Sequence, residues 1–587
     1  MLRKTKIVAT MGPACNNKET IKQLIECGMD AARLNFSHGD YDSHETMIKN
    51  IKEARKRTDK PIPIILDTMG PEIRLKSFKD GAVTLNSGAT FTLTTADIVG
   101  DDSRVAVSYT DLPDDVSEGS LILIDDGLIE LKVDKIKGSD IICTVINGGV
   151  VKNNKSVNVP GANLRLPSLT EKDIDDILFG IKMGIDYIAA SFIRCSDDVV
   201  KIQQVLDKNG GSHIKIIAKI ENREGIDNLD SILDTAHGIM VARGDLGVEI
   251  KPEEVPIVQK DMIQRANKKA KTVITATHML ESMINNPRPT RAEANDVANA
   301  IFDGTDAVML SGETASGKHP VEAVSMMARI ATMTEAFMEQ SADISRDFSK
   351  FKTSITDAFG YAACAIVSDL KATLIVNVTF SGFTARTLAK FRPSCPILAI
   401  TTSRAVYRQM NLIRGCVPVF CNKDDELRAD AFEYSLNYAE ESGLAKTGDM
   451  VVIVAGLPVG MSGTANTIRI GTVGKVLLKG ELVCGPAKTL SAPACVVDKL
   501  SDATKAFQEG DILVCRNTNP ELLPFIRKAS AIVVGTNEPQ NYEHAKNTAE
   551  ALDIPLLICE ENVCEKLTSG ITIMIDGQKG IIYNGIS

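Results

Sequence analysis

KIIAKIENREGIDNLDSILDTAHGIMVARGD, residues 215–245, contains two short apolar runs joined by a segment with helical spacing. The runs, Lys215 to Ile220 and Gly238 to Ala242, each lead into charged residues. This rhythm is typical of parallel strands connected by a helix. Eight such runs between residues 4 and 338 predict a (β/α)8 TIM barrel, with a doubly wound sheet as the alternative. The other six runs are Lys6 to Thr10, Ala31 to Phe36, Ile62 to Asp67, Tyr187 to Ser191, Thr272 to Thr277 and Asp306 to Ser311.

The barrel pattern is interrupted once, between about Pro71 and Pro167, where apolar and polar residues alternate and turn residues recur. We therefore expect an all-β insertion after the third strand. The helical pattern resumes at Thr170, whose hydroxyl can cap the next helix. These boundaries assign residues 1–70 and 168–342 to the barrel and residues 71–167 to the inserted domain.

The C-terminal part of the chain is long enough for two more domains, since 587 residues correspond to roughly four domains. Residues 353–473 show a second alternation of strands and helices, which predicts an open α/β domain. Residues 474–587 are rich in glycine and in short strands, with few helices. This last segment is expected to form a fourth domain.

Composition excludes several classes of protein. The net charge of −10 and the 4% aromatic content, with no tryptophan, argue against nucleic acid as a partner. No run approaches the roughly 20 apolar residues of a membrane span, so we expect no membrane association. The 13 cysteines include no Cys-x-x-Cys pair and several lie in apolar runs, which predicts reduced thiols in a cytoplasmic protein.

Reactive side chains follow five of the eight predicted strands. In a barrel these strand ends meet on one face, where the chemistry is carried out. Glu221 and Asp245 follow neighbouring strands and offer two hard oxygen ligands for Mg²⁺ or Mn²⁺. Lys219 and Arg33 add cations that suit a phosphate or an enolate. The expected substrate is therefore anionic and phosphorylated.

A second oxygen-rich cluster at these strand ends contains only one charge, which suits a monovalent cation better than a divalent one. Its members are Asn35, Ser37, Asp67 and Thr68. Another motif, Gly312 to Lys318, has the spacing of a phosphate-binding loop but is followed by His319 in place of Ser or Thr. An ordinary turn between the eighth strand and its helix explains those glycines better.

Several of these strand-end motifs, taken in order, resemble the pyruvate kinase family, of the bacterial kind with an extra C-terminal domain. The resemblance implies a barrel, a mobile β-barrel lid, an α/β regulatory domain and a homotetramer. It also implies transfer of a phosphoryl group from phosphoenolpyruvate to ADP, giving pyruvate and ATP. The motifs are Arg33-Leu-Asn-Phe-Ser-His-Gly39, Leu66-Asp-Thr-Met-Gly-Pro-Glu-Ile-Arg74, Ile217-Ala-Lys-Ile-Glu-Asn222, Met240-Val-Ala-Arg-Gly-Asp-Leu-Gly247, Ala276-Thr-His-Met-Leu280 and Ser311-Gly-Glu-Thr-Ala315.

The resemblance also implies a role for each matching residue. Catalysis would rest on Lys219, Arg33 and Thr277, and the substrate would contact these three together with Gly244 and Asp245. Mg²⁺ would be bound by Glu221 and Asp245, K⁺ by Asn35, Ser37, Asp67 and Thr68, and the nucleotide phosphates by Arg74 and Lys155. Glu72 is the family's usual sign of K⁺ dependence. Met69 and Ser316 stand where the family usually has lysine.

The regulatory domain and the last domain carry two further hypotheses. A loop of hydroxyls and backbone N–H groups precedes a predicted helix, and such a loop can bind a phosphate, with an ordinary helix cap as the alternative. Its residues are Thr379, Ser381, Gly382, Phe383 and Thr384. The resemblance implies that the phosphate belongs to an allosteric effector. The last domain resembles the swivelling phosphohistidine domain of phosphoenolpyruvate-utilising enzymes. His544 stands near the matching position, but the flanking residues differ, which favours an ordinary structural histidine.

Two other functions fit the same strand-end residues. A lyase or aldolase could use a Glu and Asp metal site to stabilise a pyruvate enolate. Lys219, the monovalent-cation cluster and the β insertion argue against that reaction. A sensor of phosphorylated metabolites without catalytic activity is the other alternative, and turnover with ADP distinguishes it from an enzyme.

Overall fold

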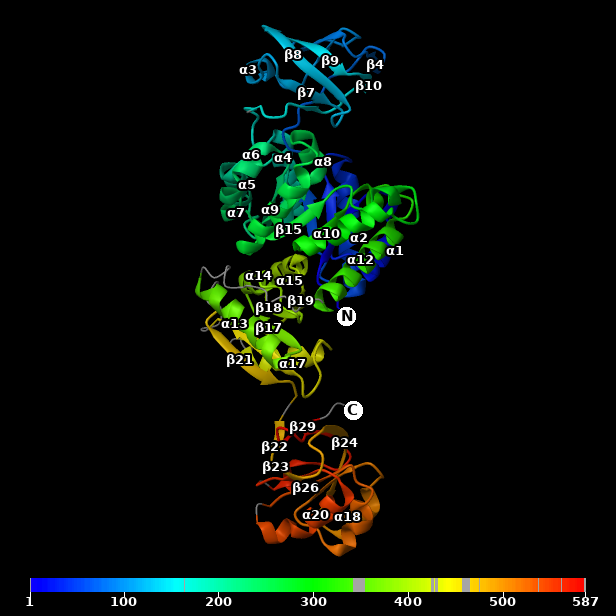
Figure 1. The fold of residues 1–587 in the computed structure, drawn as a ribbon, viewed down its shortest axis with the longest axis vertical. Coiled ribbons are helices and arrows are strands. Elements are labelled where there is room, and N and C mark those ends of the chain that lie inside the picture. The colour runs from blue at the N-terminus through cyan, green and yellow to red at the C-terminus, as the bar shows by residue number, and fades with distance from the viewer. Residues whose placement is uncertain are drawn as a thin grey trace. The chain divides into compact units, whose positions relative to one another are not determined.

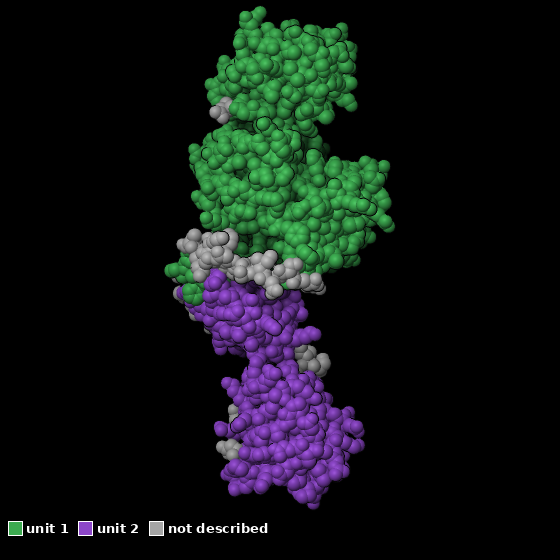
Figure 2. Space-filling model, in the orientation of Figure 1, with its two compact units in different colours: residues 1–360, 379–392, 401–420 green, residues 361–378, 393–400, 421–587 purple. Residues whose placement is uncertain are grey.

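The computed structural model describes residues 2–162, 164–340, 354–423, 427, 431–456, 465–474, 476–536, 538–560 and 562–584. The chain forms two compact units (Figure 2). Unit 1 comprises residues 1–360, 379–392 and 401–420, and unit 2 comprises residues 361–378, 393–400 and 421–587. No helix within the described residues is long and apolar enough to cross a membrane.

A closed barrel of eight parallel strands is the centre of unit 1 (Figure 1). The strands follow one another in the order β1-β16-β15-β14-β13-β12-β3-β2. This closure confirms the predicted TIM barrel and rules out the doubly wound sheet. The strands are β1 (Lys6–Met11), β2 (Ala31–Asn35), β3 (Ile64–Asp67), β12 (Tyr187–Ala190), β13 (Lys215–Ile220), β14 (Gly238–Ala242), β15 (Thr272–Ala276) and β16 (Ala307–Leu310).

Helices follow the barrel strands and bury their apolar faces against them, as the periodicity predicts. The predicted cap is present: the Asp173 N–H donates to the Thr170 hydroxyl at 3.0 Å, and Asp173 accepts from the Thr170 N–H. Residues Gly312–Ala315 form a short helix after β16, in keeping with a strand-to-helix turn. The helices are α1 (Lys18–Cys27), α2 (Tyr41–Thr58), α4 (Glu171–Met183), α5 (Ser196–Lys208), α6 (Arg223–Asp227), α7 (Leu229–Thr235), α8 (Arg243–Glu249), α9 (Val255–Lys268), α10 (Arg291–Asp303), α11 (Gly312–Ala315) and α12 (Pro320–Gln340), with 3-10 turns η1 (Pro13–Cys15) and η2 (Glu281–Ile284).

The insertion after β3 is an all-β domain with its own apolar core. Its sheets have the strand orders β11-β7-β8-β9-β5-β6 and β10-β4. The two ends of the insertion are hydrogen-bonded to each other, since Leu75 N–H donates to Lys155 at 2.9 Å and Val157 N–H to Ile73 at 2.8 Å. Its elements are β4 (Ala82–Leu85), β5 (Thr90–Thr94), β6 (Arg104–Ala106), α3 (Leu112–Asp115), β7 (Leu121–Ile124), β8 (Ile129–Lys137), β9 (Asp140–Asn147), β10 (Gly149–Lys152) and β11 (Val157–Asn158).

The segment after α12 contains the strands and helices of a second α/β series, as predicted. In unit 2, strands β18, β17, β20 and β21 are neighbours in that order. In unit 1, Leu412 is buried among the side chains that fill the barrel interior. The elements are α13 (Ile355–Leu370), β17 (Leu374–Val378), α14 (Phe383–Lys390), β18 (Ile397–Thr401), α15 (Arg404–Gln409), η4 (Met410–Leu412), β19 (Cys416–Phe420), α17 (Ala431–Glu441), β20 (Met450–Ala455) and β21 (Thr467–Thr472).

The C-terminal part of unit 2 contains a mixed sheet of eight strands, in the order β22-β29-β28-β24-β25-β26-β27-β23. His544 lies on α20, and its Nδ1 is 2.9 Å from the Thr518 hydroxyl. The elements are β22 (Val476–Lys479), β23 (Glu481–Cys484), β24 (Thr489–Val497), α18 (Leu500–Ala506), β25 (Ile512–Cys515), η5 (Pro520–Leu522), α19 (Leu523–Ile526), β26 (Ala531–Val534), α20 (Pro539–Leu552), β27 (Leu556–Ile558), α21 (Val563–Lys566), β28 (Thr572–Asp576) and β29 (Ile581–Asn584).

Candidate functional site

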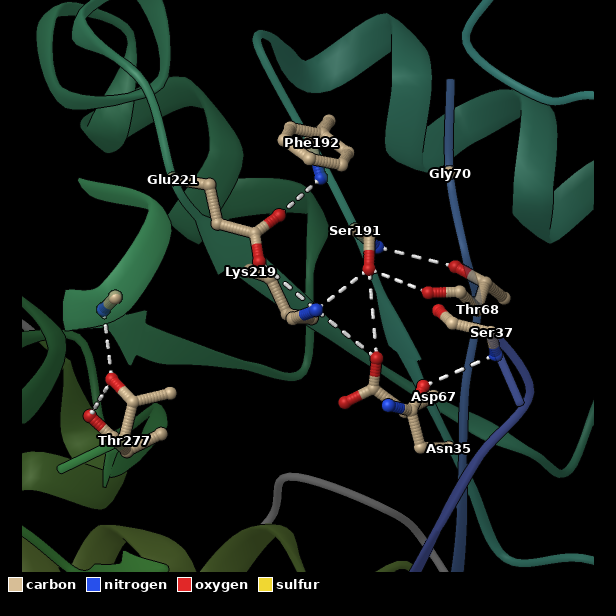
Figure 3. Close-up of polar contacts among 12 residues, drawn as sticks. Asn35, Ser37, Asp67, Thr68, Gly70, Ser191, Phe192, Lys219, Glu221 and Thr277 are labelled. Carbon is tan, nitrogen blue, oxygen red and sulfur yellow. Dashed lines mark hydrogen bonds and ion pairs between the residues drawn. The ribbon is translucent and has the colours of Figure 1, made fainter. Parts of the chain in front are cut away.

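Four of the predicted site residues form a buried ionic network near the ends of β2, β3 and β13. Figure 3 shows three of them, Asp67, Lys219 and Glu221. Lys219 Nζ lies 2.9 Å from Glu221 Oε1 and 3.1 Å from Asp67 Oδ1. Arg33 Nε donates to Asp67 Oδ2 at 2.6 Å. Parallel strands end on the same face of a barrel, so residues far apart in the sequence meet here. The structure therefore brings two cations and two carboxylates into contact at the expected face.

Asp67 is fully engaged by the two cations. Burial raises the pKa of this carboxyl, but Arg33 and Lys219 outweigh burial and hold the pKa below its ordinary value. Burial lowers the pKa of Lys219, and the Asp67 and Glu221 carboxylates overcome that effect and raise it. Lys219 is therefore a fixed ammonium at neutral pH. A fixed positive charge with little contact with water is what a transferring phosphoryl group requires.

Glu221 has fewer neighbouring cations than Asp67 to offset the effect of burial on its carboxylate. Burial raises its pKa to about 7; Lys219 lowers the pKa and the nearby Asp245 carboxylate raises it. Oε2 accepts the Phe192 N–H at 2.7 Å, whereas Oε1 has the Lys219 ion pair but no partner with hydrogen-bond geometry. A buried carboxyl that ionises reluctantly beside a second carboxylate is a place where a cation would be stabilising.

The donor set of Glu221 and Asp245 fits Mg²⁺ or Mn²⁺. Both residues offer hard oxygens, and Asp245 lines a cavity that Asn222, the residue after Glu221, also borders. Within the described residues, no group of three or more His, Cys, Asp or Glu side chains could hold a metal. An ion bound by this pair would therefore take its remaining ligands from water and substrate, as Mg²⁺ does at phosphoryl-transfer sites.

Thr277 and Gly244 meet on the next two strand ends. The Gly244 N–H donates to Thr277 Oγ at 2.8 Å, and that hydroxyl donates to the Ala276 carbonyl at 2.6 Å. Thr277 and His278 both have positive φ, at 66° and 52°, a backbone conformation that is costly for residues other than glycine. Consecutive residues of this kind are found where a fold holds a loop in a strained position for function.

Ser191 is a site residue that the sequence analysis did not identify. Its hydroxyl accepts from Lys219 Nζ at 2.7 Å and donates to the Thr68 carbonyl at 2.6 Å. Gly70 lies against it, because a Cβ on Gly70 would come within 2.9 Å of the Ser191 side chain. Ser191 follows the fourth barrel strand directly, so its position after a buried apolar run was the available signal.

The predicted K⁺ ligands lie on adjoining strands. Asn35 and Asp67 are paired across β2 and β3, and the Ser37 N–H donates to the Asn35 side chain at 3.1 Å. Thr68 directly follows Asp67 (Figure 3). The four residues are therefore neighbours, and their one carboxylate is already paired with Arg33 and Lys219.

Arg74 and Lys155 lie in the insertion, next to each other in a paired segment, since Arg74 bridges Ser156. Each has a carboxylate partner: Arg74 Nε donates to Glu72 at 2.7 Å, and Lys155 Nζ donates to Asp125 at 2.7 Å. Both cations are partly exposed, so a nucleotide phosphate could compete for them.

Two cavities open near the ionic network. One has a volume of about 170 Å³ and is bordered by Asp245, Glu72 and Asn222. The other has about 810 Å³ and is bordered by Arg33, Asn35 and His38. The larger cavity has room for a nucleoside, and the smaller one for a three-carbon acid.

The predicted effector loop lies at the start of α14. The Gly382 N–H donates to the Thr379 hydroxyl at 3.1 Å, and the Phe383 N–H donates to Ser381 Oγ at 3.4 Å. Gly382 has a φ of 72°, and the helix begins without a side-chain cap. The loop therefore has the short, hydroxyl-rich geometry that the sequence predicts, with Thr384 buried in the first turn.

Family models match most of the chain. Residues 2–324 match the barrel domain of pyruvate kinase, and residues 357–471 match its alpha/beta domain. Residues 507–580 match the mobile domain of PEP-utilising enzymes.

Individual pyruvate kinases are similar to this chain over its full length. The chain is 46% identical to pyruvate kinase from Geobacillus stearothermophilus, with 100% of this chain and 99% of the relative aligned. It is 45% identical to pyruvate kinase from Sporosarcina psychrophila over the same shares of both chains. A crystal structure of a pyruvate kinase from Cryptosporidium parvum is 40% identical, with a TM-score of 0.75 over 80% of this chain and 96% of that one.

Proposed function

The chain belongs to the pyruvate kinase family and is a pyruvate kinase enzyme, and from that premise we propose how its residues work. They transfer the phosphoryl group of phosphoenolpyruvate to ADP with Mg²⁺ at Glu221 and Asp245 and K⁺ at Asn35, Ser37, Asp67 and Thr68. The observation that carries this proposal is Lys219, a buried ammonium 2.9 Å from Glu221 and 3.1 Å from Asp67.

Each of these residues has a defined task in that reaction. Lys219 and Arg33 neutralise the phosphoryl oxygens as charge builds up in transfer. Asp67 keeps both cations in place through its two oxygens. Thr277 and the Gly244 backbone orient the substrate carboxylate. Bound at Glu221 and Asp245, Mg²⁺ would supply Lewis-acid stabilisation of substrate oxygens.

The nucleotide would use the insertion and the larger cavity. Arg74 and Lys155 reach its phosphates once their carboxylate partners Glu72 and Asp125 release them. The roughly 810 Å³ cavity bordered by His38 takes the base and ribose. A coupled assay for pyruvate formed from phosphoenolpyruvate and ADP tests the function directly. Absence of turnover with both substrates, Mg²⁺ and K⁺ present would refute it.

The K⁺ requirement can be tested at Glu72. We expect Glu72→Lys to reduce the stimulation by K⁺ at least several-fold, because an ammonium can supply the charge of the missing cation. The measurement is turnover against K⁺ concentration at constant ionic strength. Glu72→Gln is the matched control: it removes the same carboxylate charge beside Arg74 but adds no cation, and its amide oxygen can still accept from Arg74 Nε, so it should keep the K⁺ requirement. Identical K⁺ curves for Glu72→Lys and wild type would contradict the prediction.

The loop of Thr379, Ser381, Gly382, Phe383 and Thr384 is proposed to bind a phosphorylated effector. A sugar phosphate or AMP should then lower the apparent KM for phosphoenolpyruvate roughly fivefold or more, within the usual range of allosteric coupling. Ser381→Asp with Thr384→Asp places like charge in the loop and should abolish that activation. Initial rates with and without each effector make the measurement. Activation that survives in the variant, or is absent from wild type, would assign regulation elsewhere.

We also propose that the protein is a homotetramer and that it lies in the cytoplasm. Met333, Phe337 and Phe302 are 72%, 59% and 46% exposed, and the two phenylalanine rings contact each other edge-on at 6.2 Å between α10 and α12. Exposed apolar clusters of this kind are typical of subunit contacts. The cysteines are all free thiols, as in proteins of reducing compartments.

A further inference from the structure

A group of cations lies at the N-terminal ends of three adjacent barrel strands, on the face opposite the catalytic strand ends. Lys215 begins β13, His237 directly precedes β14, and Lys271 directly precedes β15. Arg386 on α14 is close enough to lower the pKa of all three. These four residues, called the cation cluster below, are partly buried.

No carboxylate pairs with the cation cluster among the residues that the structure describes. Arg386 has one long contact, 3.5 Å from Nη1 to the Ser381 carbonyl, and Lys271 Nζ donates to the Ala236 carbonyl at 2.7 Å. Other interior cations of unit 1 are paired, such as Lys390 with Asp357 at 2.6 Å and Arg408 with Asp186 at 2.7 Å. Within the part of the chain that the structure describes, the cluster lacks the carboxylate partner that Lys390 and Arg408 have.

Two hydrogen-bond donors face each other inside the cluster. The Ile216 N–H donates to His237 Nδ1 at 3.2 Å, so a neutral ring has its hydrogen on Nε2. That nitrogen lies 3.3 Å from Lys215 Nζ, which is also a donor. Burial, with Lys215 and then Arg386, lowers the pKa of His237 to about 3, so the ring is neutral at pH 7. Because the His237 Nε2–H and Lys215 Nζ are both donors, an acceptor atom placed between them could accept a hydrogen bond from each.

The other charged and polar residues that the structure describes around the cluster do not supply this acceptor. Asp306 and Arg392 line the same small cavity as Lys271 and Arg386, but they pair with each other. Asp234, which acts on Lys271 from a distance, pairs with Lys269. The Tyr187 hydroxyl, which faces Arg386, donates to the Gln409 carbonyl. The net charge of the site is therefore positive.

We propose that the cation cluster of Lys215, His237, Lys271 and Arg386 binds a phosphate-type oxyanion, separately from the catalytic centre and next to the effector loop, whose Ser381 carbonyl Arg386 contacts. Three positive charges and an N–H from different elements suit a compact dianion with oxygens on several sides. Lys271 and Arg386 border a cavity of only about 10 Å³, which holds about one water, so the ligand is a compact oxyanion that these flexible side chains can close around and not a whole sugar or nucleotide. Inorganic phosphate is the simplest such probe.

The test is titration of the full-length enzyme with inorganic phosphate, by calorimetry and thermal unfolding, at ionic strength held constant with sodium chloride. Lys271→Met with Arg386→Met should weaken one saturable binding event roughly tenfold or more, because charge-assisted hydrogen bonds are lost. Lys201→Met, which removes an exposed charge on α5, is the matched control and should bind as wild type does. Basal turnover should be unchanged in both variants.

Two further variants separate this site from the others. Lys219→Met and Ser381→Ala with Thr384→Ala should both retain the binding event. If either removes it, or if the cluster variant binds like Lys201→Met, or if no saturable binding occurs, the proposal is wrong.

In chloride alone Arg386→Met should have an unchanged or higher Tm, because it relieves repulsion. A lower Tm of Arg386→Met in chloride, together with an unchanged shift of Tm on addition of phosphate, would instead show that Arg386 has a structural role. If Arg386→Met does not fold, Arg386→Lys, which keeps the charge, should bind phosphate while Lys271→Met alone weakens it.

Discussion

Replacing Lys219 with methionine should lower kcat by roughly 10³-fold or more while the protein stays folded. The change keeps much of the side-chain volume and removes an ammonium that is needed when the phosphoryl group transfers. Removal of one charge-stabilising donor from a buried catalytic centre typically costs 10²–10³-fold in rate. Asp67 keeps its 2.6 Å bond from Arg33 in the variant, so the network retains one cation. Steady-state turnover and thermal unfolding measure the two effects.

Two other variants show whether the loss comes from the charge at this position. Lys219→Arg keeps a cation and should recover part of the activity, and it replaces the methionine variant if that fails to fold. Lys201→Met removes a lysine from the exposed face of α5 and should leave kcat unchanged. Near-normal kcat in Lys219→Met would overturn the assignment of this residue to phosphoryl transfer.

Glu221→Gln is expected to have the second-largest effect, a fall in kcat of roughly 10³-fold with a higher Mg²⁺ concentration for half-maximal activity. The amide has nearly the same shape but lacks the anionic oxygens that bind a hard dication, and a catalytic metal contributes several kcal/mol. The Phe192 N–H retains an oxygen acceptor if the amide turns its carbonyl toward it. Turnover measured against Mg²⁺ and Mn²⁺ concentration gives both quantities.

The control for Glu221→Gln is Glu253→Gln, which neutralises an exposed carboxylate after α8 and should leave the Mg²⁺ curve unchanged. Wild-type enzyme treated with EDTA should lose activity and regain it on addition of excess Mg²⁺. Turnover that persists in EDTA, or an unaltered Mg²⁺ curve in Glu221→Gln, would show that this pair does not hold the metal.

The barrel could be predicted from the sequence because its signals are local. Each strand is a short apolar run followed by a helical pattern, and β13 and β14 have the predicted bounds. The Thr170 cap needs only a hydroxyl and an acidic residue three positions later. Polar residues at strand ends could be predicted to converge because a barrel brings those ends together.

Features that depend on side-chain contacts across the fold could not be predicted in the same way. Ser191 is an ordinary serine in the sequence, and only its 2.7 Å contact with Lys219 identifies its role. The sharing of Asp67 between Arg33 and Lys219 likewise depends on rotamers of residues on three strands. The cation cluster joins Lys215 to Arg386, which are 171 positions apart by subtraction of their numbers. No spacing rule links such residues.

The insertion after β3 has a consequence for how the barrel assembles during folding. Strands β3 and β12 are neighbours, yet 119 residues separate Asp67 from Tyr187. Closing a flexible loop of that length costs about 1.6 kcal/mol more than closing one of about 20 residues, by the (3/2)RT ln n scaling. The folded insertion removes most of that cost, because its own hydrogen bonds, Leu75 to Lys155 and Val157 to Ile73, hold its two ends together. An insertion that folds early thus gives the barrel a short effective chain between its third and fourth strands, and the contact order that limits barrel formation is lower than the sequence separation suggests.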